Sequence, residues 1–307
     1  MNSFESPSTW LGPACAFLSS CTWALGSGTY SQLSERNSAF AINFTRASIA
    51  LPMFVIAALW VHGASSVTTI ESRHWGWLTL SMLASYGFAD VVFLAATRDL
   101  GVPGALSVAS FYPVWTVLLG VIRGEKLLAM TQYLGLGITL VGVISTVLAG
   151  AKVQTRPRTD PGAIRRGVGF AALTSLLWAV NSFSVAQGAS DLPVHWVNVI
   201  RMLLALILCG ALGWWREGRR SLGWRPWLQG SSLRSRFWVF PMEAFGGALF
   251  FAYGLTHSPL VLASTLSSLA PVLSVPLAWW NGTENVSFPR VLGVLVVTGG
   301  LYLLLSP

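Results

Sequence analysis

Ten long runs of apolar residues follow one another along the chain, separated by short polar segments. Each run holds about 20 residues, the length that an α-helix needs to cross a hydrocarbon core of about 30 Å. The pattern therefore predicts ten membrane-spanning helices. They cover residues 12–31, 39–60, 75–97, 103–122, 129–150, 167–186, 192–215, 237–256, 258–280 and 288–305.

The runs of the first half recur in the second half. The segment AFLSSCTWAL, which starts at residue 16, matches AALTSLLWAV, which starts at residue 171, and the same offset places Arg46 on Arg201. Later in each half Pro113 falls on Pro271. Five spans per copy is an odd number, so the second copy must enter the membrane in the opposite orientation. The predicted fold is an all-α membrane protein of ten transmembrane helices in two inverted five-helix repeats, an architecture typical of secondary transporters.

Two connectors between these runs are longer than the rest. Residues 151–166 join the two copies, and residues 216–236 follow the seventh run. Neither is long enough to form a separate soluble domain. We therefore expect the first repeat in residues 1–150, a basic connector in residues 151–166 and the second repeat in residues 167–307.

Proline and glutamate residues mark particular points of these helices. Pro113 and Pro271 are expected to kink the fourth and ninth spans, because proline lacks the N–H that an internal helical hydrogen bond needs. Glu125 and Glu284 fall just past the same spans. We expect their carboxylates to bind the positive end of the next helix.

The composition supports a membrane protein. Of 307 residues, 53% are hydrophobic and only 10% are charged, whereas soluble domains carry about 25% charged residues. The net charge of +8 comes from Lys and Arg in the connectors, where lipid headgroups account for it better than nucleic acid does. The expected partners are therefore membrane lipid and a small-molecule substrate. The three cysteines lie inside apolar runs without metal-binding spacing, and no cofactor is expected.

The connectors carry an uneven charge. Those after odd-numbered spans hold 13 Lys and Arg residues, and the others hold three, namely Arg73, Arg123 and Lys126. The positive-inside rule places the 13 in the cytoplasm, with both termini outside.

Several residues recur in the same order in both halves. They are Trp23, Arg46, Pro113, Gly124-Glu125, Leu134-Gly135 and Gly142 in the first, and Trp178, Arg201, Pro271, Glu284, Leu292-Gly293 and Gly300 in the second. This order resembles the EamA-type exporters of the drug/metabolite transporter superfamily. The second half departs from it at Thr283, where the family has glycine. The resemblance implies a ten-helix transporter that moves small organic metabolites, commonly amino acids or related compounds, out across the bacterial inner membrane. It also implies cytoplasmic termini, against the charge count, so the orientation stays open.

Four charged side chains lie well inside the predicted spans: Arg46, Asp90, Arg201 and Glu243. A charge at the bilayer centre costs about 2.5–3.5 kcal/mol, so such residues usually face a cavity or a partner. With a rise of ~1.5 Å per residue, Arg46, Asp90 and Glu243 lie ~9–12 Å below one membrane face. Arg201 lies ~14 Å below the other. The sequence thus predicts three ionisable groups at one level.

Two interpretations of these charges stay open. In the functional one, Arg46 and Arg201 bind an anionic group of the substrate, and Glu243, in preference to Asp90, carries a coupling proton. In the structural one, Arg46 forms a static ion pair with Asp90 or Glu243. Aromatic and amide side chains that would complete a substrate site, or simply pack between helices, are Trp23, Trp178, Tyr86, Tyr112, Asn43 and Asn198.

The leading functional hypothesis is a secondary transporter that exports small metabolites by alternating access, with proton coupling as an option. One alternative is an antiporter of phosphorylated or nucleotide-linked sugars, which would need more cations, such as lysines, in the spans. Another is a membrane-embedded enzyme or sensor, but the spans show no metal cluster or activated nucleophile. Nothing in the sequence determines an oligomeric state.

Overall fold

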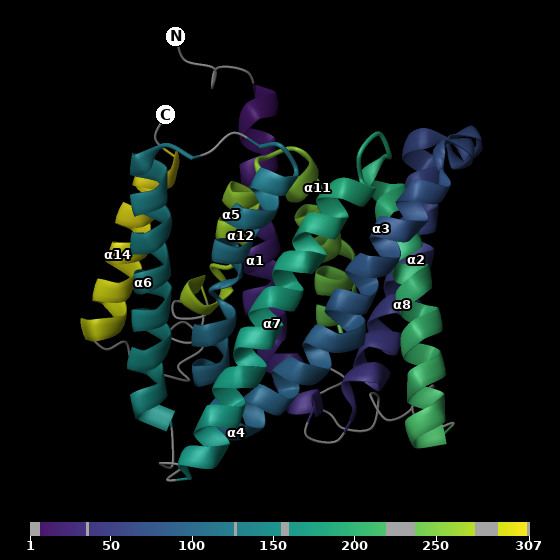
Figure 1. The fold of residues 1–307 in the computed structure, drawn as a ribbon. Helices are drawn as coiled ribbons and strands as arrows, with labels where there is room; N and C mark the ends of the chain where they lie inside the picture. The colour runs from purple at the N-terminus through teal and green to yellow at the C-terminus, as the bar shows by residue number, and fades with distance from the viewer. Residues whose placement is uncertain are drawn as a thin grey trace.

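The computed structural model describes residues 7–34, 37–125, 128–154, 160–218, 237–273 and 288–305, and these are helical apart from short turns. Figure 1 shows their arrangement. The first half contains α1 (Pro7–Ser34), α2 (Ala39–His62), η1 (Ala64–Thr69), α3 (Ser72–Met82), η2 (Leu83–Ala89), α4 (Asp90–Ala109), α5 (Tyr112–Ile122) and α6 (Met130–Gln154). The second contains α7 (Pro161–Gly188), α8 (Val194–Glu217), η4 (Pro241–Gly247), α11 (Ala248–Thr256), α12 (Leu260–Ser267) and α14 (Phe288–Leu305).

The helices have the length and apolar surface that a bilayer requires. Within the described residues, four stretches are long and apolar enough to cross a membrane: Ala39–His62, Ser72–Leu100, Pro161–Gly188 and Val194–Glu217. Shorter apolar helices cover Tyr112–Ile122, Met130–Thr146, Leu260–Leu273 and Val291–Leu305. Large apolar side chains such as Trp60, Leu118 and Leu295 lie exposed on the outside, as expected where lipid replaces water as the solvent.

The two halves run in opposite directions. In Figure 1, α1 begins and α14 ends at one end of the bundle, whereas α6 ends and α7 begins at the other. We call the first end the Arg123 face, because Arg123 donates to Ala186 near the end of α7. We call the second the Arg98 face, because Asp99, next to Arg98, pairs with Arg166 near the start of α7. The first helix of each half thus starts from opposite faces, as an inverted repeat requires.

Local irregularities of the backbone also repeat. The π-helical turns η2 (Leu83–Ala89) and η4 (Pro241–Gly247) occupy equivalent places in the two halves. Helix α4 is followed by a turn at residues 110–111, and α12 by a turn at residues 268–269. Pro113 and Pro271 come directly after these turns, so both kinks that the prolines predict are present as helix breaks. Pro113 lies in the first turn of α5, where its missing N–H costs nothing.

The helical assignment runs without interruption over α4, residues 90–109, across the connector that the sequence places between residues 97 and 103. Phe93 and Tyr112, on either side of that connector, nevertheless both pack against Trp178, at 5.5 and 6.0 Å. A straight helix would separate them by roughly 28 Å at about 1.5 Å per residue, so the chain doubles back between them. A further break falls at residues 110–111, before Pro113 and within the predicted span.

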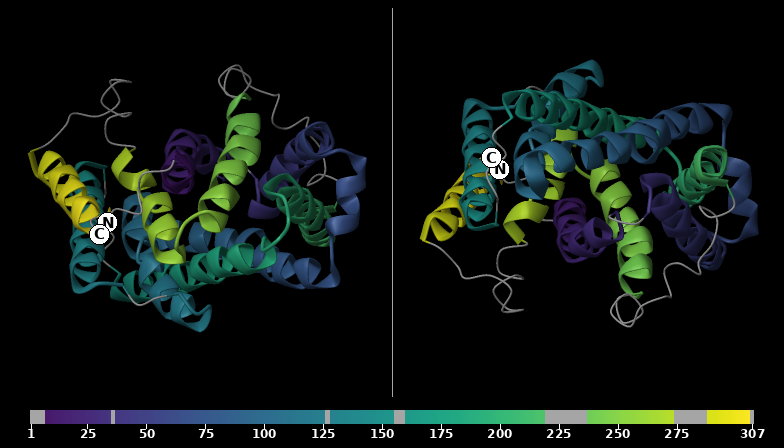
Figure 2. Two further views of the ribbon diagram at one scale, coloured as in Figure 1. Left: turned by 90° about the horizontal axis from the view of Figure 1, so that it is seen from above. Right: turned by 90° about the horizontal axis from the view of Figure 1, so that it is seen from below.

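Helices α6 and α14 form a separate pair at one edge of the molecule, with α2, α3 and α8 at the opposite edge (Figure 2). A methyl group at Gly135 would collide with the backbone of Gly300 and Leu304. The pair is therefore held at close range by glycine, as small residues allow for helices in lipid.

Glu125 joins the two halves at the Arg123 face. Both of its carboxylate oxygens accept from the backbone N–H of Leu260, the first residue of α12, at 3.1 and 3.0 Å. The expectation that it binds the next helix, α6, is wrong. The side chain of Gln132 already accepts from Ala129 at the start of α6, whereas α12 lacks an N-cap side chain of its own because Pro259 precedes it. Glu284 and most of the 216–236 connector lie outside the described residues.

Candidate functional site

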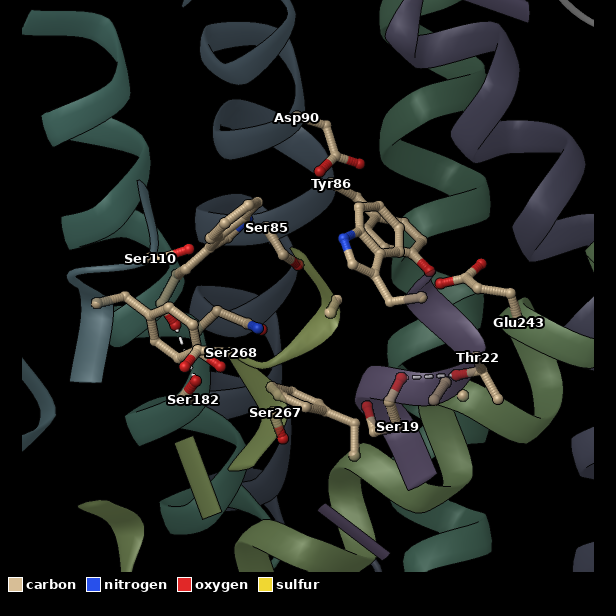
Figure 3. A pocket seen from close by; sticks show the side chains of 18 of the residues that line it. Ser19, Thr22, Ser85, Tyr86, Asp90, Ser110, Ser182, Glu243, Ser267 and Ser268 are labelled. Carbon is tan, nitrogen blue, oxygen red and sulfur yellow. Dashed lines mark hydrogen bonds between the residues drawn. The ribbon is translucent and has the colours of Figure 1, made fainter. Parts of the chain in front are cut away.

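A cavity of about 160 Å³ lies in the middle of the bundle, between helices of both halves (Figure 3). Most of the predicted site residues line it: Trp23, Arg46, Tyr86, Asp90, Tyr112, Trp178, Arg201 and Glu243. The other two, Asn43 and Asn198, are fully buried and contact the arginines from behind. Segments far apart in the sequence thus bring all ten side chains to one region.

Arg46, Asp90 and Glu243 meet in one cluster, as the depth estimate predicts. The Nε and Nη2 groups of Arg46 donate to the two carboxylate oxygens of Glu243, at 3.0 and 2.7 Å. Tyr30 of α1 donates its hydroxyl to the same carboxylate at 2.6 Å. Three donors therefore converge on Glu243, which is only 7% exposed. Bidentate, charge-assisted hydrogen bonds of this kind are among the strongest in proteins.

Asp90 is held more loosely than Glu243. Its carboxylate accepts from Asn43 at 2.7 Å and lies 3.5 Å from the Nη1 atom of Arg46. Its side chain is 21% exposed, against 9% for Glu243. Because the Arg46 charge is balanced by Glu243, Asp90 leaves an excess negative charge at this end of the cavity.

Arg201 has a different environment. Its three donor groups bond only to neutral side chains: Ser81 at 3.2 Å, Asn198 at 3.2 Å and Asn181 at 3.4 Å. No carboxylate in the described parts of the chain forms an ion pair with it. The side chain is 4% exposed and lines the cavity. A buried guanidinium without a counter-charge is costly, and an anionic ligand would compensate for it.

The repeat explains why the two arginines differ. Glu243 occupies in η4 the place that Ser85 occupies in η2, and Ala248 at the start of α11 matches Asp90 at the start of α4. Both carboxylates of the cavity therefore lie at the Arg46 end, and the equivalent places near Arg201 carry neutral residues. The inverted repeat is symmetric in its backbone and asymmetric in its charge.

Aromatic rings also line the cavity. The guanidinium of Arg46 lies over Tyr86, at 4.6 Å from the ring centroid, and Trp178 packs edge-on against Tyr112 at 6.0 Å. Figure 3 shows Asp90, Tyr86 and Glu243 on one side of the cavity, and Ser110, Ser182 and Ser268 on the other. Ser110 and Ser268 belong to the turns before Pro113 and Pro271. The helix breaks thus bring hydroxyl groups to the cavity wall.

Sequence reasoning missed several residues of this region. Tyr30 donates to Glu243, and Ser81 donates to Asn181 while accepting from Arg201. Neither is charged or repeated in the other half, so no sequence signal marks them. His62 and His195, from different halves, lie 3.1 Å apart at the Arg123 face, although nothing in the sequence links them. Within the described residues no cluster of His, Cys, Asp or Glu is placed to bind a metal ion.

Comparisons with known proteins agree with this architecture. The profile of the EamA-like transporter family matches the chain twice, over residues 10–148 and 165–306. An uncharacterized transporter of Archaeoglobus fulgidus is 25% identical over 285 residues, which cover 93% of this chain and 94% of that protein. An uncharacterized transporter of Synechocystis sp. is 25% identical over 207 residues, 66% of this chain and 59% of that protein.

A solved structure described as the crystal structure of a protein has the same fold. It superposes with a TM-score of 0.74 at 19% sequence identity, covering 97% of this chain and 96% of the other. At this identity the likeness concerns the fold alone.

Proposed function

Because the chain belongs to the EamA-like transporter family, and is therefore a multi-pass membrane transporter, we propose that it exports a small zwitterionic metabolite by alternating access. Amino acids and related compounds are the substrate class that this proposal names. The same proposal places the protein in the bacterial inner membrane and makes the direction of transport outward. Both parts rest on the resemblance to exporters.

The separation of charge in the central cavity carries the proposal. Arg201 offers a positive charge that no described carboxylate balances, and Asp90 leaves an excess negative charge at the other end. A zwitterion satisfies both ends at once, with its carboxylate on Arg201 and its ammonium group on Asp90. A phosphorylated sugar carries two negative charges, and the Arg46 charge is already matched by Glu243. The cavity therefore favours a zwitterion over a phosphorylated sugar.

Asp90 is the carboxylate that we assign to proton coupling. Sequence reasoning favours Glu243 for this role, but its carboxylate already accepts from Tyr30 and from two groups of Arg46. Asp90 has one short hydrogen bond and a more exposed side chain. Its carboxylate can therefore bind either a proton or the ammonium group of the substrate, and each displaces the other. Such competition for one site is the basis of exchange between a proton and a substrate.

Substrate counterflow in proteoliposomes tests the substrate class. The panel contains labelled amino acids, their methyl esters, which lack the carboxylate, and their decarboxylated amines. We expect the full amino acids to compete at least tenfold better than either derivative. Equal competition by esters and amino acids would overturn the assignment of Arg201 as the anion subsite.

The variant Arg201→Gln sharpens this test. A hydrogen bond to a charged group contributes about 1.5–3 kcal/mol, so loss of the guanidinium should weaken amino-acid binding roughly 10- to 100-fold and leave binding of the methyl esters unchanged. Arg73→Gln is the matched control, because Arg73 is half exposed at the membrane surface and its loss should alter neither ligand class.

A further inference from the structure

A second, smaller cavity of about 70 Å³ lies beside the central one, between α1, α2 and α4. The two cavities share Trp23, Arg46, Asp90 and Leu106 as their common wall. At its far end the small cavity reaches Ala39, the first residue of α2, and Thr97, which precedes Arg98. It therefore extends from the central cavity towards the Arg98 face.

The equivalent region of the second half is packed more tightly at its far end. By the offsets of the repeat, Leu255 matches Thr97, Val185 matches Tyr30 and Val194 matches Ala39. Tyr30 and Ala39 are about as buried as their counterparts. Thr97, however, is half-buried and lines the small cavity, whereas Leu255 has no exposed surface and belongs to the main hydrophobic core. The two equivalent regions thus differ at the end that leads to the membrane face.

We infer that the small cavity is the substrate passage between the central site and the Arg98 face, with Asp90 as a subsite for the cationic end of the substrate along it. Trp23 and Leu106 form the partition that the substrate must pass. The packed region around Leu255 is the equivalent passage to the Arg123 face, closed in this conformation. This inference rests on the proposed function for the charge of the substrate, but the location of the passage does not depend on it.

The lining of the small cavity suits a cationic group. Asp90 faces both cavities, so an ammonium group can stay near one carboxylate while it crosses the partition. The rings of Trp23, Tyr30 and Phe93 also line the cavity, and aromatic faces attract cations. Among the described residues of this wall the cation is Arg46, which pairs with Glu243 at 2.7 Å.

Thiol labelling tests the passage without requiring any substrate. In a protein whose native Cys15, Cys21 and Cys209 are replaced by alanine, Thr97→Cys and Leu255→Cys are each reconstituted and treated with cationic or anionic methanethiosulfonate reagents. Arg166→Cys marks the Arg98 face, because Arg166 is 61% exposed there. We expect the thiol at residue 97 to react at least tenfold faster than that at 255. We also expect it to react faster with the cationic reagent, and only from the side that labels residue 166.

Two results would overturn the inference: equal labelling at the two positions, or labelling of residue 97 from the side opposite to residue 166. Equal rates with the two reagents would remove the cationic subsite. A counterflow panel without any zwitterionic substrate would contradict the proposed function and leave the labelling result intact. The two failures are therefore distinguishable.

A steric block provides the second measurement. Thr97→Trp should fill the small cavity and reduce transport at least tenfold. It should also slow substrate association with the detergent-solubilised protein, because the equivalent passage near Leu255 is closed in this conformation. Leu118→Trp is the control, since Leu118 is 58% exposed on the outer surface of α5. Normal transport by a well-folded Thr97→Trp protein would exclude this route.

Discussion

Replacing each cavity carboxylate by its amide separates the structural from the functional acid. In Glu243→Gln, the amide offers one acceptor oxygen where the carboxylate offers two, and its NH₂ group faces the donors of Arg46 and Tyr30. In the wild type, Glu243 accepts from the Nε and Nη2 groups of Arg46 at 3.0 and 2.7 Å and from the Tyr30 hydroxyl at 2.6 Å. In Asp90→Asn, the amide oxygen still accepts from Asn43. The variant loses only the electrostatic attraction across the 3.5 Å contact to Arg46.

The expected losses of stability differ accordingly. Removing one partner of a buried ion pair costs about 3–5 kcal/mol. Because the Asp90 carboxylate lies close enough to compensate part of the Arg46 charge, we expect about 3 kcal/mol for Glu243→Gln. This value corresponds to a change of roughly 100-fold in the ratio of folded to unfolded protein. For Asp90→Asn we expect a loss of about 1 kcal/mol or less, the value of an ordinary hydrogen bond.

Two assays distinguish the variants. Unfolding in mixed micelles of increasing SDS fraction, followed by tryptophan fluorescence, measures stability, with Ser85→Ala as the control at the equivalent place in the first half. Transport driven by a pH gradient and substrate exchange without a gradient are then compared in proteoliposomes. We expect Asp90→Asn to lose gradient-driven transport altogether, and to keep exchange only at substrate concentrations roughly 10- to 100-fold higher, because the amide no longer binds the substrate ammonium group through a charged hydrogen bond.

The result that would refute this reasoning is a reversal of the two phenotypes. A stable Glu243→Gln protein that has lost only gradient-driven transport would make Glu243 the coupling acid, as the sequence suggests. A strongly destabilised Asp90→Asn protein would show that the contact to Arg46 contributes far more than its length implies.

Three further predictions follow from contacts outside the cavity. Glu125→Ala leaves the first N–H of α12 without its acceptor; we expect a loss of about 1 kcal/mol in micelle unfolding, and no change would show that the contact between the halves is dispensable. Gly142→Val places a side chain where even a methyl carbon would lie 2.7 Å from Val297, so thermal stability in detergent should fall, whereas Gly137→Val, with open space around it, should be neutral. Trp178→Ala removes the ring that packs against Tyr112 and Phe93 and should weaken substrate binding in equilibrium titrations at least tenfold; unchanged binding would place the ring outside the site.

Local patterns in the sequence are enough to predict the outline of this protein. Apolar runs of bilayer length, their repetition in the second half and the prolines before the two helix breaks each depend on neighbouring residues. The same holds for the four charges inside the spans, because the cost of burying a charge makes such residues rare and noticeable. The fold class and the region of the candidate site were therefore predictable.

Only the tertiary structure decided which charges are paired. Arg46 has the same sequence context as Arg201, yet it meets Glu243, 197 residues away, while Arg201 meets neutral side chains. Glu125 likewise binds α12 of the other half instead of the helix that follows it. In the same way, the region near Thr97 is hollow and its equivalent near Leu255 is packed. Each of these outcomes depends on how distant helices pack, and a pattern of neighbouring residues carries no information about that packing.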